Sequence, residues 1–223
     1  MTRRTLLLVL AAAAAACVDN RVTIEVRGHA FPSAFAPCNF VPGGQFQLGP
    51  GVLDVSAGRT YGAVLYVKNN ASNTTEASPG TVASSNAWRA LAARVRVNPS
   101  DYIADFPPSP AMIPVQVSQR LPLDGQTTLP GAESAQFTDI ISAEVGLLIA
   151  NAAIAAGPQP QRIVVGVKLE GETLSGTKVD SGEWFYAIDI CQGCLPTLAD
   201  CIAAGGTKLD SCFGPWQDPI ACN

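Results

Sequence analysis

The sequence has few of the side chains on which nucleic-acid-binding proteins depend. Charged residues make up only 14% of the 223 residues, and the formal net charge is −4. Nucleic-acid binding needs a basic patch that neutralises phosphates, and the sequence has no cluster of lysine and arginine to form one. We therefore exclude nucleic acid as a partner.

The usual signs of an active site are also missing. His29 is the single histidine, and its place beside a predicted strand end indicates a turn residue with local hydrogen bonds rather than a catalytic base. No Gly-x-Ser-x-Gly elbow occurs. Glu183 and Asp189 flank the last predicted strand at a spacing that puts them about 20 Å apart, too far for a glycosidase pair. The sequence predicts no enzyme, no catalytic residue and no cofactor.

The N-terminal hydrophobic run is too short to span a membrane. Arg3 and Arg4 precede an uncharged run over residues 5–16, and the first acidic residue is Asp19. About 12 residues rise about 18 Å as a helix, whereas the hydrocarbon layer is about 30 Å thick. The order of positive, apolar and small residues predicts a signal peptide over residues 1–16. Without Arg3 and Arg4, the formal charge changes from −4 to −6.

The end of this segment, Ala14-Ala15-Ala16-Cys17, resembles the lipobox of bacterial lipoproteins. It departs from that pattern at Ala14, where the family usually has leucine. The resemblance implies that Cys17 becomes the lipid-modified first residue of the mature chain, and that acyl chains such as palmitate hold the protein to a membrane. Val18 in the sorting position implies the outer membrane, facing the periplasm or the surface. Cleavage by ordinary signal peptidase at Ala-x-Ala is the alternative.

Alternating apolar and polar residues predict many short strands joined by turns rich in glycine and proline. Strands are predicted at residues 22–27, 52–56, 61–68, 91–97, 115–119, 161–169 and 183–190. Residues 61–70 resemble the second strand of Ig-like sandwich modules on bacterial surfaces. The sequence therefore predicts an all-β, Ig-like β-sandwich.

One helix is predicted over residues 139–155, as an insertion that packs across an opening of the sandwich. Asp139 is its candidate N-cap, and Gly157-Pro158 is its stop. The predicted buried stripe consists of Ile141, Val145, Leu148 and Ala152. The resulting domains are the signal peptide over residues 1–16, a β-sandwich over 17–190 and a cysteine-rich tail over 191–223.

Six cysteines remain after Cys17, and in an exported chain we expect them to be oxidised. They are Cys38, Cys191, Cys194, Cys201, Cys212 and Cys222. Because five of the six lie in the tail, full pairing requires at least one disulfide from Cys38 to the tail. The chain-entropy model gives such a long loop about 5 kcal/mol of stabilisation.

The spacing of the Cys191-Gln-Gly-Cys194 segment is compatible with three chemistries other than a structural disulfide. Its spacing also occurs in zinc knuckles and redox pairs, but no second Cys-x-x-Cys and no histidine in the tail complete a zinc site. Haem attachment needs histidine where Leu195 stands. The sequence thus predicts no metal site and favours disulfides.

The tail resembles that of predicted lipoproteins of Gram-negative bacteria, in which the last strand leads into Cys-x-Gly-Cys-Leu and the chain closes with cysteine, proline, Gln-Asp and a final cysteine. The matching residues are Cys191, Gly193, Cys194, Leu195, Cys212, Pro215, Gln217, Asp218 and Cys222. The resemblance implies no activity. It implies a stapled appendage on the sandwich.

Two functions follow as hypotheses. The first is a non-enzymatic, lipid-anchored cell-envelope protein with a structural role or a role in binding envelope proteins. The alternative is a surface carbohydrate-binding module, in which Trp184 and Trp216 stack on sugar rings. Core packing is the competing interpretation of both tryptophans.

Overall fold

The computed structural model describes residues 23–30, 40, 44–71, 85–103, 111–206, 209–210, 212, 217–218 and 221–222, with the backbone alone at 102–103, 209–210 and 221–222. Residues 1–16, Cys17, Cys38, Trp216 and the side chain of Cys222 therefore lie outside the described residues. In the described part, no helix is both long enough and apolar enough to cross a membrane.

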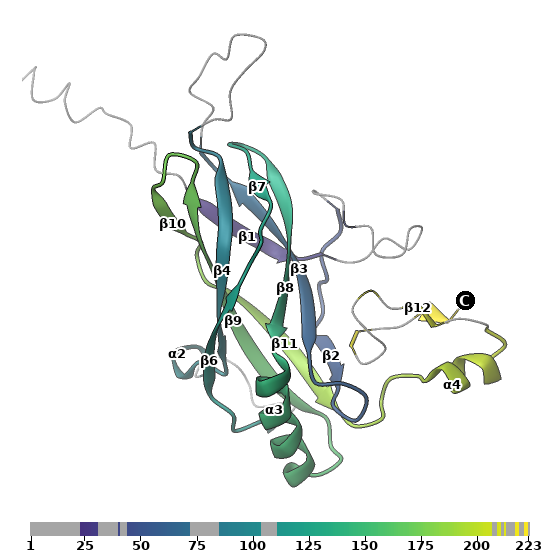
Figure 1. The fold of residues 1–223 in the computed structure, drawn as a ribbon. Coiled ribbons are helices and arrows are strands. Elements are labelled where there is room, and N and C mark those ends of the chain that lie inside the picture. Colours follow the sequence, from purple (N-terminus) through teal and green to yellow (C-terminus); the bar gives the residue numbers. More distant parts are fainter. Residues whose placement is uncertain are drawn as a thin grey trace, which may run out of the picture.

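The described chain is mostly β-structure, arranged in two main sheets (Figure 1). The small sheet has the order β1 (Ile24–His29), β3 (Tyr61–Asn69), β8 (Glu133–Ile141). The main path of the large sheet is β2 (Gly51–Asp54), β11 (Trp184–Cys191), β9 (Gln161–Thr173), β4 (Trp88–Val97), β6 (Val117–Pro122). The prediction of an all-β chain is confirmed.

Shorter elements complete the two sheets and the tail. The short strands β5 (Ala111–Met112) and β10 (Lys178–Asp180) pair with β9, and β7 (Thr127–Thr128) pairs with β4. In the tail, β12 (Leu209–Asp210) pairs with β13 (Ala221–Cys222). The helices are α2 (Ser100–Ile103), α3 (Ala143–Ala156) and α4 (Leu198–Ala203). The sequence pattern predicts only α3, although Thr197 and Asp200 form a capping box at α4.

One hydrophobic core fills the space between the two sheets. Leu65 and Val67 of β3 and Val165 and Val167 of β9 belong to it, and all four are fully buried. Alternate residues of each strand point to this core because side chains of a strand alternate between its faces. Each such side chain contributes about 1.5–3 kcal/mol, so the core is the main source of stability.

The outer face of the large sheet is polar, in contrast to the core face, and carries a row of ion pairs. Glu183 and Asp189, the two candidate catalytic carboxylates of the sequence, take part in these ion pairs. Arg162 pairs with Asp189 at 2.6 Å, and Arg96 pairs with both Glu183 and Asp101. Exposed ion pairs contribute little to stability, and these carboxylates mark the solvent face of the sheet.

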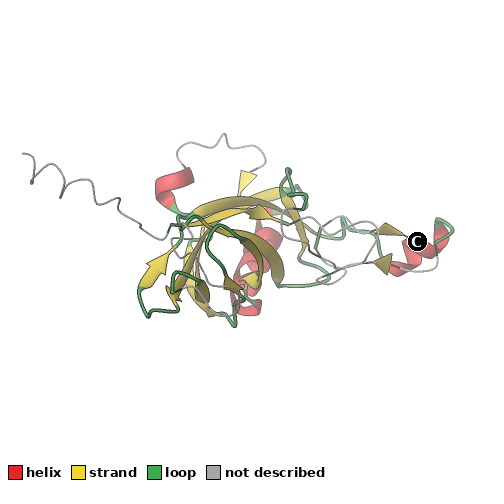
Figure 2. Cartoon of the chain, turned by 90° about the horizontal axis from the view of Figure 1, so that it is seen from above, coloured by secondary structure: helices red, strands yellow, loops and turns green. Residues whose placement is uncertain are grey.

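Helix α3 lies across one end of the two sheets (Figures 1 and 2), as the sequence predicts, but its start and its buried face differ from the prediction. Ser142 is the N-cap, and its hydroxyl accepts from the Val145 N–H. Asp139 belongs to β8 instead. Ile149 is fully buried, whereas Leu148 is 47% exposed. Of the predicted stripe, Val145 is buried and Ala152 packs against the core. The sequence pattern assigns Leu148 to the wrong face, and Ile141 belongs to β8 because the helix begins after it.

Gly146 fixes which face of α3 is turned inward. A Cβ atom at this position would overlap the carbonyl oxygen of Arg59, in the turn between β2 and β3. The helix therefore rests directly on that backbone, and a larger residue here would push it away from the core.

Strand β8 is absent from the sequence prediction because its core-facing positions are polar. Ser134, Gln136 and Thr138 occupy buried places where alternation would require apolar residues. They are satisfied internally: the Gln136 amide bonds the backbone of Gln126, and Ser134 bonds Thr128. Buried polar groups that have hydrogen-bond partners are tolerated in a core, but a strand with such groups cannot be detected from the pattern of hydrophobic residues.

Candidate functional site at the junction of sandwich and tail

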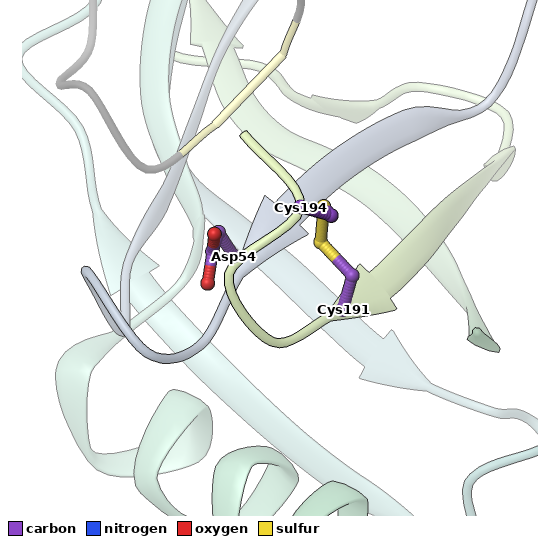
Figure 3. A group of neighbouring side chains, drawn as sticks. All are labelled: Asp54, Cys191 and Cys194. Atoms are coloured by element: carbon purple, nitrogen blue, oxygen red, sulfur yellow. A yellow bond between two sulfur atoms is a disulfide. The ribbon is translucent and has the colours of Figure 1, made fainter. Parts of the chain in front are cut away.

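The tail leaves the sandwich through a disulfide-closed turn. Strand β11 ends at Cys191, Gly193 takes a positive φ of 65°, and a disulfide joins Cys191 to Cys194 with their Cα atoms 5.9 Å apart (Figure 3). Cys201 and Cys212 are also disulfide-bonded. The Cys191–Cys194 disulfide agrees with the oxidised cysteines that the sequence predicts.

Asp54, the last residue of β2, holds this turn against the large sheet (Figure 3). Its carboxylate accepts from the N–H groups of Gly193 at 2.9 Å and Leu195 at 3.3 Å, and from the N–H and hydroxyl of Ser56 at 3.0 and 2.6 Å. Burial alone would raise the pKa of Asp54, but the hydrogen bonds from Ser56, Gly193 and Leu195 outweigh burial and lower it. Asp54 is therefore ionised in the fold and acts as an acceptor.

The ligand atoms of Asp54, Cys191 and Cys194 lie within 4.8 Å of one another, a spacing that could suit a metal ion. The chemistry of these donors does not fit one in the oxidised chain. The two sulfur atoms are bonded to each other, and zinc binds thiolates. The carboxylate oxygens already accept four hydrogen bonds. This cluster is better described as a hydrogen-bonded turn.

The tail returns to the sandwich at Gln217, which completes the edge of the small sheet. Strand β1 pairs with β3 only as far as Leu65, so Gly62 of β3 has no partner residue in β1. The Gly62 N–H donates to Gln217 Oε1 at 2.8 Å, and Gln217 Nε2 donates to the Gly62 carbonyl at 2.9 Å. This pair of bonds imitates a neighbouring strand. Gln217 is 2% exposed and also bridges to Leu53 of β2, so it links both sheets.

Asp218 makes the second attachment of the tail. Its N–H donates to the Val52 carbonyl at 2.8 Å, and its carboxylate accepts from the Val52 N–H at 3.2 Å and from the Tyr61 hydroxyl at 2.6 Å. Burial, followed by the Asp218 charge, raises the pKa of Tyr61 well above its ordinary value. Tyr61 therefore stays a neutral donor, and the pair holds tail and core together.

His29 differs from its predicted place in a turn. It is the last residue of β1, is 2% exposed, and its ring meets the edges of Tyr186 at 5.4 Å and Tyr61 at 6.2 Å between centroids. Burial lowers its pKa, against a smaller opposing effect of Asp218. The prediction failed because a bulge between Val26 and Gly28 carries the strand past the glycine that seemed to end it.

The tryptophans divide between core and partial exposure. Trp88 is fully buried, and its indole N–H donates to the Val179 carbonyl at 2.8 Å. Trp184 is partly exposed, with its ring stacked on Tyr186 at a centroid distance of 5.2 Å. One face of its ring is therefore occupied. Trp216, the other predicted sugar-stacking residue, lies outside the described residues.

The junction contains residues whose role the sequence pattern does not predict. Gln217 and Asp218 belong to the tail resemblance, but that resemblance implies only a stapled appendage. Asp54 also bonds the nearby Ser56, but its partners in the tail turn, Gly193 and Leu195, lie more than 130 residues away, so no local pattern marks its role at the junction. A polar residue that pairs with backbone groups this far along the chain leaves no periodic signal.

Fold and junction define a β-rich protein of two packed sheets whose cysteine-containing tail is hydrogen-bonded to both of them. The chain matches no protein-family model and no curated protein.

Proposed function

We propose that this chain is a non-enzymatic, lipid-anchored protein of the cell envelope, held in the outer membrane through Cys17, with a structural or protein-interaction role. The proposal of a lipid anchor rests on the order of the N-terminal residues: Arg3 and Arg4 come first, an apolar run that ends in small residues follows, and Cys17 comes last. We further propose that the two-sheet fold is Ig-like and that the tail is a disulfide-stapled appendage.

The chemistry of the junction supports a role without catalysis. Asp54 on β2 and Asp218 in the tail have oxygen atoms engaged by backbone and side-chain donors. His29 is enclosed by aromatic rings. A general base needs access to substrate, whereas these groups face the protein's own backbone and so favour attachment of the tail.

Metabolic labelling tests the anchor. Cys17→Ala should abolish incorporation of radioactive palmitate and release the protein from membranes, because the acylated thiol is gone. Ala14→Leu is the matched control, since it completes the lipobox and should label at least as well. Undiminished labelling of Cys17→Ala would end the proposal.

Intact-mass measurement tests the stapled tail. With Cys17 acylated, the six other cysteines should form three disulfides and the purified chain should lack six hydrogens relative to its reduced form. Free thiols, or a bound zinc ion, would contradict the proposal for the tail while leaving the palmitate result unaffected.

A carbohydrate-binding role is the second candidate, favoured by the partly exposed Trp184. Its test is a glycan array with the full chain and with Trp184→Ala. Signals that Trp184→Ala removes and that Trp184→Phe retains would support stacking on sugar. An array without signals would remove this candidate.

A further inference from the structure

Among the described residues, one edge of the small sheet is unpaired along β8. In the described part of the chain β8 pairs only with β3, in an antiparallel ladder. The Asn69 N–H donates to the Ala132 carbonyl at 3.1 Å, which marks a hydrogen-bonded pair at the end of this ladder. Hydrogen-bonded and non-hydrogen-bonded pairs alternate in such ladders, and this sets the direction of every later backbone group.

The alternation turns the N–H and C=O groups of Ser134, Gln136 and Thr138 toward β3. Those of Ala135, Phe137 and Asp139 therefore point away from β3, to the open edge. The opposite side of β3 supports this assignment, because the Val64 carbonyl and both backbone groups of Gly62 bond on that side. Strand β8 thus presents a row of backbone donors and acceptors that another strand could use.

A cavity of about 440 Å³ lies beside this edge, between β8 and the end of β6. Its lining residues are Leu121, Pro122, Leu123, Asp124, Phe137, Thr138 and Asp139. Two glutamines bridge the sheets close to it: Gln119 donates to the Ile140 carbonyl at 3.1 Å, and Gln136 donates to the Gln126 carbonyl at 2.9 Å. The cavity and the exposed edge of β8 together are called the β8 groove below.

The walls of the β8 groove differ in polarity. Leu121 and Leu123 pack against the core from the β6 side, while Phe137 is 54% exposed on β8. Asp124 and Asp139 supply two carboxylates, and no cationic side chain is among the described residues that line the groove. In the described part of the chain neither carboxylate takes part in an ion pair.

We propose that the β8 groove binds an extended, basic peptide segment of another protein, which adds as a strand to β8. Alternate side chains of an added strand point to opposite faces. One set, apolar, would meet Leu121 and Leu123; the other set, lysine or arginine, would lie beside Asp139 and the ring of Phe137. This inference rests on the proposed interaction role and names its kind of partner.

A second copy of this chain fits the groove less well. Pairing two copies through β8 would bring Asp124 and Asp139 of one near the same carboxylates of the other, and like charges across a strand pair are destabilising. The desolvation that already raises the pKa of Asp139 would increase in such a dimer. A cationic partner relieves this cost, because it favours the charged carboxylate.

The test measures binding of a defined probe to the full chain, purified from membranes in detergent. The probe is a fluorescent nonapeptide of alternating valine and lysine, with a valine and glutamate peptide as its counterpart. Anisotropy titrations should show binding of the lysine peptide, at least tenfold weaker binding of the glutamate peptide, and about threefold weaker binding to Asp139→Asn. Glu144→Gln, an exposed carboxylate on α3, should bind as the parent does.

Hydrogen exchange locates the probe. The bound lysine peptide should slow exchange at the Phe137 amide and leave α3 unchanged. Equal affinity for both peptides, an undiminished affinity of Asp139→Asn, or protection elsewhere would overturn the proposal. The proposal would also be overturned if sedimentation showed a dimer in the absence of peptide and if hydrogen exchange at the β8 amides were slowed in that dimer. Palmitate labelling of Cys17 is independent of all these readings, so failure of the groove and failure of the anchor are distinguishable.

Discussion

The backbone N–H and C=O groups at the two edges of the small sheet differ in whether another part of the protein bonds them. At Gly62 the edge meets the tail, and the Gln217 amide bonds both backbone groups at 2.8 and 2.9 Å. Along β8 the backbone groups of Ala135, Phe137 and Asp139 have no neighbouring strand in the described part of the chain. One edge is closed by the protein itself, and the other is left open.

Burial accounts for the difference. The Gly62 edge lies inside the junction, where Gln217 is 2% exposed, and buried backbone groups without a partner are costly. Phe137 and Asp139 are exposed, so water can satisfy the backbone groups of these two residues until a strand arrives. The tail thus contributes Gln217 to the sandwich, and the edge at Gly62 is closed only when Gln217 is in place.

Gln217→Ala should have the largest effect, because it breaks the closed edge. It leaves the N–H and C=O of Gly62 buried without partners, and we expect a loss of about 2–4 kcal/mol in the free energy of unfolding. Urea unfolding of the full chain measures it. Gln192→Ala, an exposed glutamine in the disulfide turn, is the control and should change stability by less than about 0.5 kcal/mol. Equal effects would mean that the tail does not close this edge.

Asp54→Asn should have a smaller effect, which depends on pH. Asparagine can accept with one oxygen only, so we expect a loss of about 1–3 kcal/mol at pH 7. The pKa of Asp54 is lowered in the fold from its ordinary 3.8. Its stabilisation is therefore full above that value and is lost as the pH falls through the folded pKa.

Unfolding of both proteins at pH 7 and at pH 3 checks this sign. The difference between parent and Asp54→Asn should shrink in acid, because the parent carboxylate becomes protonated. A difference that stays constant or grows in acid would show that Asp54 does not hold the turn as a carboxylate.

Asp139→Asn should have the smallest effect, and of opposite sign. Burial raises the pKa of Asp139, so the charged form is disfavoured in the fold and its cost appears as the pH rises above the ordinary value. Solvent screening limits the gain in stability at pH 7 to a few tenths of a kcal/mol. Thermal unfolding at pH 7 measures it. A clear loss of stability would mean that the carboxylate has a structural partner and that the groove is not open.

The strands rich in apolar residues are predictable from the sequence. Residues 61–68 and 161–169 contain most of β3 and part of β9, because a short, nearly continuous apolar run indicates a buried strand, and both runs are largely buried. Strand β8 is not predictable, since Gln136 and its neighbours reverse that pattern with polar groups satisfied by β7 and its loop. The start of α3 is missed for the same reason. Because β8 is not recognised, its last residues, 139–141, are assigned to the helix.

The junction was beyond prediction for a different reason. Gln217 and Gly62 are 155 residues apart, and a side-chain amide that pairs with a backbone edge has no periodicity. The tail resemblance singles out Gln217 and Asp218 without their role. The Cys191–Cys194 disulfide agrees with the prediction of oxidised cysteines, which rests on the cysteine count and the expected compartment rather than on geometry.

Hydrogen exchange of the free protein tests the contrast between the two edges most directly. Gly62 and Phe137 lie in neighbouring strands of one sheet, where Gly62 is opposite Asp139 and Phe137 is opposite Val64, and neither amide bonds across the shared ladder. We predict slow exchange at Gly62, at a rate set by global unfolding, and fast exchange at Phe137. Fast exchange at Gly62, or equal protection of both amides, would contradict the account of one closed and one open edge.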